Sequence, residues 1–99
     1  MKLIVALVRP FTVEKIVSAL EDLDRFPGMT IIDAEGFGQI SIAAVEHELN
    51  PFRPRKRIEI TCPDEMVEKI VAEIRLQAHT GKRGDGLINV LTVEDSLMI

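Results

Sequence analysis

Cysteine and aromatic residues are scarce in this chain. Its 99 residues include one cysteine and neither tryptophan nor tyrosine. A lone thiol, Cys62, cannot close an internal disulfide, which fits a reducing cytoplasm, and we interpret it as a small buried side chain rather than a nucleophile. The only aromatic residues are four phenylalanines. This scarcity argues against an RNA-binding sheet, because such sheets stack bases on exposed aromatic rings.

Long apolar runs and an excess of basic charge are also missing. The longest apolar run, residues 3–8, is far shorter than the roughly 20 residues that cross a bilayer, and no secretory cleavage pattern follows it. The formal net charge of −4 argues against a surface that wraps nucleic acid. With 46% hydrophobic and 28% charged residues, the composition is globular. The length predicts one cytoplasmic domain over residues 1–99, without membrane insertion.

An internal repeat organises the chain. Residues 13–17 and 67–71 both read Val-Glu-Lys-Ile-Val, and the same shift of 54 positions (67 − 13) aligns Lys2 with Lys56. We interpret the chain as two copies of one strand–helix unit. Strand-length segments are expected at 3–8, 29–34, 57–61 and 87–93.

The two helices of these copies have the same pattern. Thr12 is expected to cap the first helix and Asp64 the second. The apolar positions of each helix fall on one face; they are Val13, Ile16, Val17 and Leu20 in the first copy, and Val67, Ile70, Val71 and Ile74 in the second.

Two βαβ units in sequence predict an α+β, ferredoxin-like fold. It has a four-stranded antiparallel sheet with both helices on one face and a long loop between the second and third strands. Residues 3–8 are apolar on both sides of their strand, so the uncovered face needs a partner. A symmetric homo-oligomer is the simplest cover.

Three segments could carry chemistry. The cations Arg53, Arg55, Lys56 and Arg57 are either solvated side chains at the start of a strand or a phosphate or carboxylate site. Gly36-Phe37-Gly38 is either a bulge or a close backbone approach to a ligand. Residues 80–86 place Lys82 and Arg83 among three glycines, a pattern suited to phosphate.

The long loop, residues 39–54, is expected to be functional because long loops in compact domains usually are. Glu46, His47 and Glu48 within it are weak candidates for metal ligands, since such a site would need further ligands from a neighbour. No nucleophile–base grouping stands out, so no catalytic residue is assigned and an enzyme is not expected.

Five segments together resemble the PII signal-transduction proteins. The resemblance covers nearly the whole chain, and the segments occur in family order. They are Met1-Lys2-Leu3-Ile4-Val5-Ala6-Leu7-Val8-Arg9-Pro10-Phe11, Gly28-Met29-Thr30, Gly36-Phe37-Gly38, Arg57-Ile58-Glu59-Ile60 and Thr80-Gly81-Lys82-Arg83-Gly84-Asp85-Gly86.

The resemblance implies a homotrimeric regulator. Adenine nucleotide would bind between subunits, joined in many members by 2-oxoglutarate and Mg²⁺, and the loop at 39–54 would be the T-loop that docks on a membrane transporter or a regulated enzyme. By position, Thr30 and Thr61 would flank the adenine, and Gly36, Phe37 and Gly38 would lead into the loop. The phosphate side would comprise Arg55, Arg57, Lys82, Arg83, Gly84, Asp85 and Gly86.

The departures from the family pattern concern the phosphate side. Leu87 stands where the family usually has lysine, Met98 stands at one of its C-terminal arginine positions, and no tyrosine is available for uridylylation. These losses argue against a tight site for ATP, Mg²⁺ and 2-oxoglutarate, and leave ADP or AMP as alternatives. We therefore expect an effector-sensing regulator of a partner. The alternative is a metal-responsive or scaffold trimer that binds no nucleotide.

Overall fold

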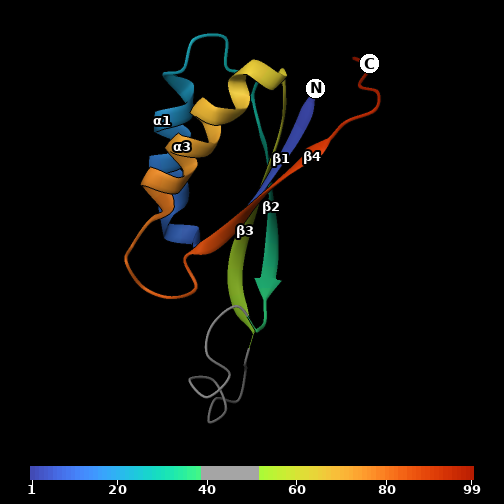
Figure 1. The fold of residues 1–99 in the computed structure, drawn as a ribbon. Coiled ribbons are helices and arrows are strands. Elements are labelled where there is room, and N and C mark those ends of the chain that lie inside the picture. The colour runs from blue at the N-terminus through green and yellow to red at the C-terminus, as the bar shows by residue number, and fades with distance from the viewer. Residues whose placement is uncertain (39–51) are drawn as a thin grey trace.

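The computed structural model describes residues 1–38 and 52–99. Within them, four strands form one antiparallel sheet in the order β2-β3-β1-β4. Two α-helices lie side by side on one face of it (Figure 1). The elements are β1 (Lys2–Val8), α1 (Val13–Glu21), β2 (Thr30–Gly36), β3 (Arg53–Cys62), α3 (Val67–Ala78) and β4 (Gly86–Thr92). The predicted ferredoxin-like fold is confirmed.

The core lies between the helices and the central strands. Alternate residues of β1 and β3 face the helices because side chains alternate across a strand. Ile16 and Leu20 of α1, with Ile70 and Ile74 of α3, are fully buried against them. Both helices therefore use the apolar positions that the repeat predicts. Cys62 belongs to this core, and burial raises the pKa of its thiol.

Each helix starts differently from the expectation. A turn of 3-10 helix, Pro10–Thr12 before α1 and Asp64–Met66 before α3, separates strand from helix. Thr12 occupies the N-cap position, but its buried hydroxyl donates to the Arg9 carbonyl oxygen at 2.7 Å. Asp64 lies inside the 3-10 turn and pairs with the amino group of Met1 at 2.9 Å. Neither side chain caps a helix, so both capping predictions are wrong.

Strand β3 is longer than predicted. It begins at Arg53, so the basic cluster lies within the sheet rather than before it. The last two residues of the predicted loop, Arg53 and Pro54, are therefore strand, which corrects that boundary. Phe52 is described and precedes the strand, whereas residues 39–51, which include the metal candidates Glu46, His47 and Glu48, lie outside the described residues.

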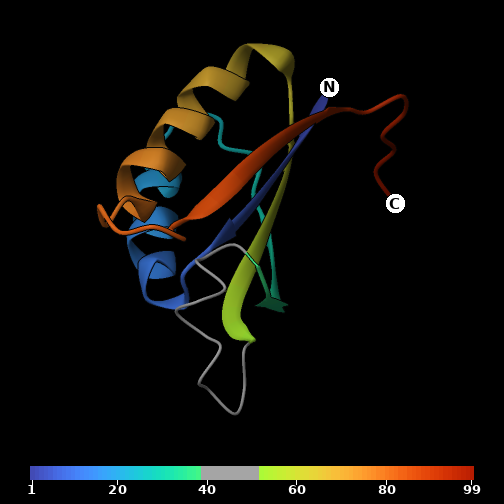
Figure 2. The ribbon, with the colours of Figure 1, turned by 60° about the horizontal axis from the view of Figure 1, so that its bottom comes forward.

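The second face of the sheet has no cover within the described part of the chain (Figure 2). Leu3, Val5 and Leu7 of β1 point to this face and are opposite Leu91, Asn89 and Leu87 of β4 in the register. Arg57 and Glu59, two residues apart on β3, pair on the same face at 2.8 Å. Leu87 and Leu91 are 39% and 46% exposed. The expected unpartnered apolar face is therefore present.

Candidate functional site

The predicted site residues fall into two groups in the structure. One group lies at the end of the sheet where β1 ends and β3 and β4 begin, beside the loop of residues 79–85; it contains Arg55, Lys82, Arg83, Gly84, Asp85 and Gly86. Gly36, Phe37 and Gly38 lie at the same end, but at the far edge strand β2. Thr30 and Thr61 lie toward the other end. Thr61 is six residues beyond Arg55 (61 − 55) on β3, about 20 Å at the rise of a strand. Arg57 lies between the two groups.

The glycine-rich loop folds around the Asp85 carboxylate. Asp85 Oδ2 accepts hydrogen bonds from the backbone N–H groups of Thr80 at 2.7 Å and Gly81 at 3.2 Å. Oδ1 accepts from the Thr80 hydroxyl and from Arg9 Nε, the latter at 3.0 Å. These bonds hold the pKa of the Asp85 carboxyl well below its usual range, with those from Thr80 contributing most. Asp85 therefore shapes the loop rather than pointing out of it.

Arg9 fastens this loop to the end of β1. Besides its bond to Asp85, its Nη2 donates to the Arg83 carbonyl oxygen at 2.8 Å. The sequence reasoning missed Arg9 and Thr80 as site residues. The position of Asp85 inside a glycine-rich turn could have indicated them, because a carboxylate there needs hydrogen-bond donors close in space.

Gly86 lets β4 begin directly beside β1. Its φ is +135°, and a Cβ there would lie 1.9 Å from the Leu7 carbonyl oxygen. Only glycine fits this close approach. The position of residues 84–86 against β1 is therefore set by backbone geometry as well as by the Arg9–Asp85 pair.

Arg55 is the most unusual cation of the site. It is 6% exposed. Its Nη1 donates to the Pro54 carbonyl oxygen at 2.8 Å and its Nη2 to the Gly84 carbonyl oxygen at 3.3 Å. Its buried Nε has no hydrogen-bond partner among the described residues. Burial, and then the charges of Arg9 and Arg53, lower the pKa of this guanidinium.

The surroundings of Arg55 restrict where an anion could bind. A hollow of about 680 Å³ borders it near Pro10, but Asp33 and Glu35 also line that hollow. Lys56 pairs with Asp33 there. Because these carboxylates repel an anion, the side of Arg55 that faces Gly84 is the better place for one.

The other predicted residues lie around this centre. Lys82 and Arg83 are exposed on the loop, so their charges are available to a ligand. The ring centroids of Phe37 and Phe52 are 5.6 Å apart, so the two side chains pack together where β2 ends and β3 begins. Thr30 and Thr61 do not approach Arg55 within one chain.

Two further observations concern metal ligands and membrane-spanning helices in the described residues. Within residues 1–38 and 52–99, no group of three or more histidine, cysteine, aspartate or glutamate side chains could hold a metal ion. Neither α-helix in those ranges is long and apolar enough to cross a membrane.

Comparison with known proteins gives one family over the whole chain. Residues 1–99 match the sequence profile described as nitrogen regulatory protein P-II. Curated proteins of that name from Bradyrhizobium diazoefficiens and Haemophilus influenzae are each 34% identical to the chain over 103 residues. One from Azospirillum brasilense is 34% identical over 104 residues. Each match covers 100% of this chain and 91% of the relative.

Proposed function

The chain belongs to the nitrogen regulatory protein P-II family, and from that premise we propose that it is a homotrimer that senses an adenine nucleotide and regulates a partner. Members of this family are signal transducers rather than enzymes; they form oligomers and act on partner proteins. As a family they bind adenine nucleotides and 2-oxoglutarate. The effector, the trimer and the partner of this chain are the proposed parts.

Arg55 carries the effector proposal. A buried guanidinium with an unsatisfied Nε, close to two other arginines, is costly unless an anion compensates its charge. A phosphate placed between Arg55 and the Gly84–Gly86 backbone would supply that charge and accept the free N–H. Lys82 and Arg83 would add exposed positive charge nearby.

The trimer proposal rests on the open face and on the divided site. Packing sheet to sheet would bury Leu3, Leu7 and Leu91, and would remove apolar surface from water. A neighbouring copy would also bring its own Thr30 and Thr61 toward the Arg55 end of this chain. The nucleotide would then bind between subunits.

The choice of nucleotide follows from the charges present. With Leu87 after Gly86, the loop has no lysine at that position, and Leu87 lies on the open face opposite Leu7. A polyphosphate therefore gains fewer charge-assisted contacts than it would from a lysine. We favour ADP or AMP over ATP with Mg²⁺ and 2-oxoglutarate.

The partner is proposed to bind residues 39–54, and a membrane transporter is the favoured class. Deletion of residues 43–50 is expected to leave the thermal melt unchanged and to abolish co-purification of the partner. Unfolding of the deletion variant would contradict this role.

Calorimetric titration of the full chain with ATP, ADP and AMP, with and without Mg²⁺, tests the effector. Binding is expected to weaken with added salt. Arg55→Met should weaken it ten- to a hundredfold, about 1.4 kcal/mol per factor of ten. Arg25→Gln is the matched control, because the Arg25 side chain is 90% exposed. Leu87→Lys should strengthen ATP binding.

Sedimentation equilibrium tests the trimer independently. The expected mass is about three times the 11.1 kDa of the chain. If the wild type shows no heat with any adenine nucleotide, and Leu87→Lys creates no binding in a folded trimer, the nucleotide proposal is overturned. A stable monomer would overturn the proposed intersubunit site.

A further inference from the structure

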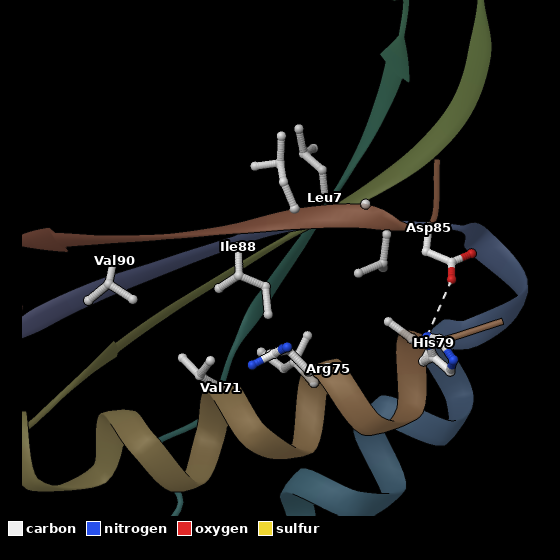
Figure 3. Close-up of a pocket in the computed structure, with 12 residues that line it drawn as sticks. Leu7, Val71, Arg75, His79, Asp85, Ile88 and Val90 are labelled. Carbon is white, nitrogen blue, oxygen red and sulfur yellow. Dashed lines mark ion pairs between the residues drawn. The ribbon is translucent and has the colours of Figure 1, made fainter. Parts of the chain in front are cut away.

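A groove lies between α3 and the edge strand β4 (Figure 3), and at one end it shares Asp85 and Gly86 with the candidate site. Its volume is about 340 Å³, within the range of sites that hold a ligand or a few side chains. β4 pairs only with β1 among the described strands, so one long side of the groove is open. Its apolar lining includes Val71, Ile74, Ala78, Ile88 and Val90.

Arg75 gives this groove a positive charge. Its side chain extends from α3 beside Val71 toward β4 (Figure 3). Within the described residues it makes no ion pair, whereas His79 at the end of the groove lies 3.9 Å from Asp85. The groove therefore combines an apolar floor with a cation that no described carboxylate compensates.

The segment after β4 has the complementary pattern. Glu94 and Asp95 come first, and the apolar residues Leu97, Met98 and Ile99 follow. Leu97 is 83% exposed, and Met98 and Ile99 are fully exposed. In Figure 2 this segment turns to the side of the sheet opposite the helices. Its apolar side chains consequently have no cover among the described residues of their own chain.

We propose that residues 94–99 of one copy bind in the α3–β4 groove of a second copy. The acidic pair would face Arg75 while Leu97 and Met98 cover the apolar floor, so the two surfaces are complementary in charge and in hydrophobicity. The proposal rests on the oligomer proposed above and specifies a contact within it. A contact that joins two different surfaces repeats around a ring, which suits a cyclic trimer.

Binding within one chain is disfavoured by where the segment starts. The Val93 N–H donates to the Met1 carbonyl oxygen at 3.2 Å, at the end of β4 far from Asp85. From there the segment leads away from the helix-covered face. A second copy therefore offers the more direct partner.

Disulfide trapping in the full chain tests the contact. Leu97→Cys combined with Val90→Cys should give covalent dimers and trimers on a non-reducing gel. The native Cys62 is fully buried and should not react in the folded protein. The matched control combines Leu97→Cys with Leu76→Cys, because Leu76 is 68% exposed on α3 but does not line the groove. This pair should not cross-link.

A charge exchange gives a second readout that needs no cysteine. Arg75→Glu should weaken trimer association at least tenfold in sedimentation equilibrium, and Glu94→Arg with Asp95→Arg in the same chain should restore it. Arg25→Glu, at an exposed position on the turn after α1, should leave association unchanged.

The outcomes separate this contact from the effector proposal. A trimer that binds nucleotide but forms no Leu97–Val90 cross-link overturns the groove contact alone. If the disulfide forms only within single chains, the segment binds the groove of its own chain and the proposed contact between copies is overturned. A monomer overturns the groove contact and the trimer together. Cross-linking between chains with rescue by the charge exchange supports it.

Discussion

The two ends of the sheet differ in how their charged groups are paired. At one end, the Met1 amino group pairs with Asp64, and Lys2 Nζ donates to Thr92 Oγ1 at 3.0 Å. These groups are exposed and each charge has a partner. At the other end, Arg9 pairs with Asp85, but Arg53 and Arg55 add positive charge close by, and Arg55 is buried.

This comparison distinguishes contacts that stabilise the fold from a buried charge, Arg55, that the fold does not require. Paired, exposed groups connect the chain at the first end, and at the second the Arg9–Asp85 pair, the Thr80 bonds and the close packing of Gly86 hold the loop without Arg55. Arg55 adds repulsion and desolvation beyond this requirement. Buried charge that does not help the fold is more often found at functional sites, so this end is where we place the effector.

Replacing glycine at each end should give the largest contrast in stability. Gly86→Ala would force a Cβ into the Leu7 carbonyl group and should lower the free energy of unfolding by about 3 kcal/mol or more. Gly28 also has a positive φ, but no atom lies within 4 Å of the position that a Cβ would take there. Gly28→Ala should therefore lose only about 1–2 kcal/mol. Urea unfolding measures both, and equal losses would contradict the close approach.

The pH dependence of stability should differ between Asp85 and Asp64. The pKa of each carboxyl is lowered in the folded state, so its stabilisation is present above the unfolded pKa, near 4, and is lost as the pH falls toward the folded value. Asp85→Asn should flatten the decline between about pH 5 and pH 2 more than Asp64→Asn does. Asp85 accepts four hydrogen bonds, three of them from the loop. Thermal melts of both variants across that pH range test this difference. Identical curves for Asp85→Asn and Asp64→Asn would contradict the stabilising role of the hydrogen bonds to Asp85.

The sequence predicted the order of elements because hydrophobic spacing and the internal repeat together mark each strand and helix. Residues 3–8 and the repeated Val-Glu-Lys-Ile-Val segments lie where the pattern placed them. The capping predictions are wrong because a 3-10 turn precedes each helix. At the N-cap, the Thr12 hydroxyl donates back to the Arg9 carbonyl oxygen, and Asp64 lies inside its turn, before the N-cap residue Met66.

The site was only partly predictable for a related reason. The basic cluster and the glycine loop were identified by composition. Their partners are distant in sequence, because Arg55 donates to Gly84, 29 residues away, and Arg9 lies 76 residues from Asp85. Local patterns carry no information about such pairs. The interpretation of the cluster as solvated side chains is wrong for Arg55 alone, since Arg53, Lys56 and Arg57 keep partial exposure.

Without effector, replacing Arg9 should change the stability of the protein much more than replacing Arg55. Arg9→Met removes the cation that compensates Asp85 and should lower stability. Arg55→Met removes a repelled, desolvated charge along with two hydrogen bonds to carbonyl groups, so the net change should stay within about 1 kcal/mol. Urea unfolding at low and high salt measures both. A larger loss for Arg55→Met would assign Arg55 to the fold rather than to a ligand.

Lys2→Gln at the opposite end should produce the smallest effect. The Lys2 ammonium makes one exposed hydrogen bond to Thr92, and an exposed contact of a long side chain contributes less than about 0.5 kcal/mol because ordering it offsets most of the gain. Its melting temperature should remain close to that of the wild type at every salt concentration. Nucleotide titration of the same variant should also be unchanged, because Lys2 is separated from the Arg55 end by the length of β1. If Lys2→Gln weakened nucleotide binding as strongly as Arg55→Met, the effect of Arg55 would reflect general loss of positive charge. The distinction between the two ends of the sheet would then fail.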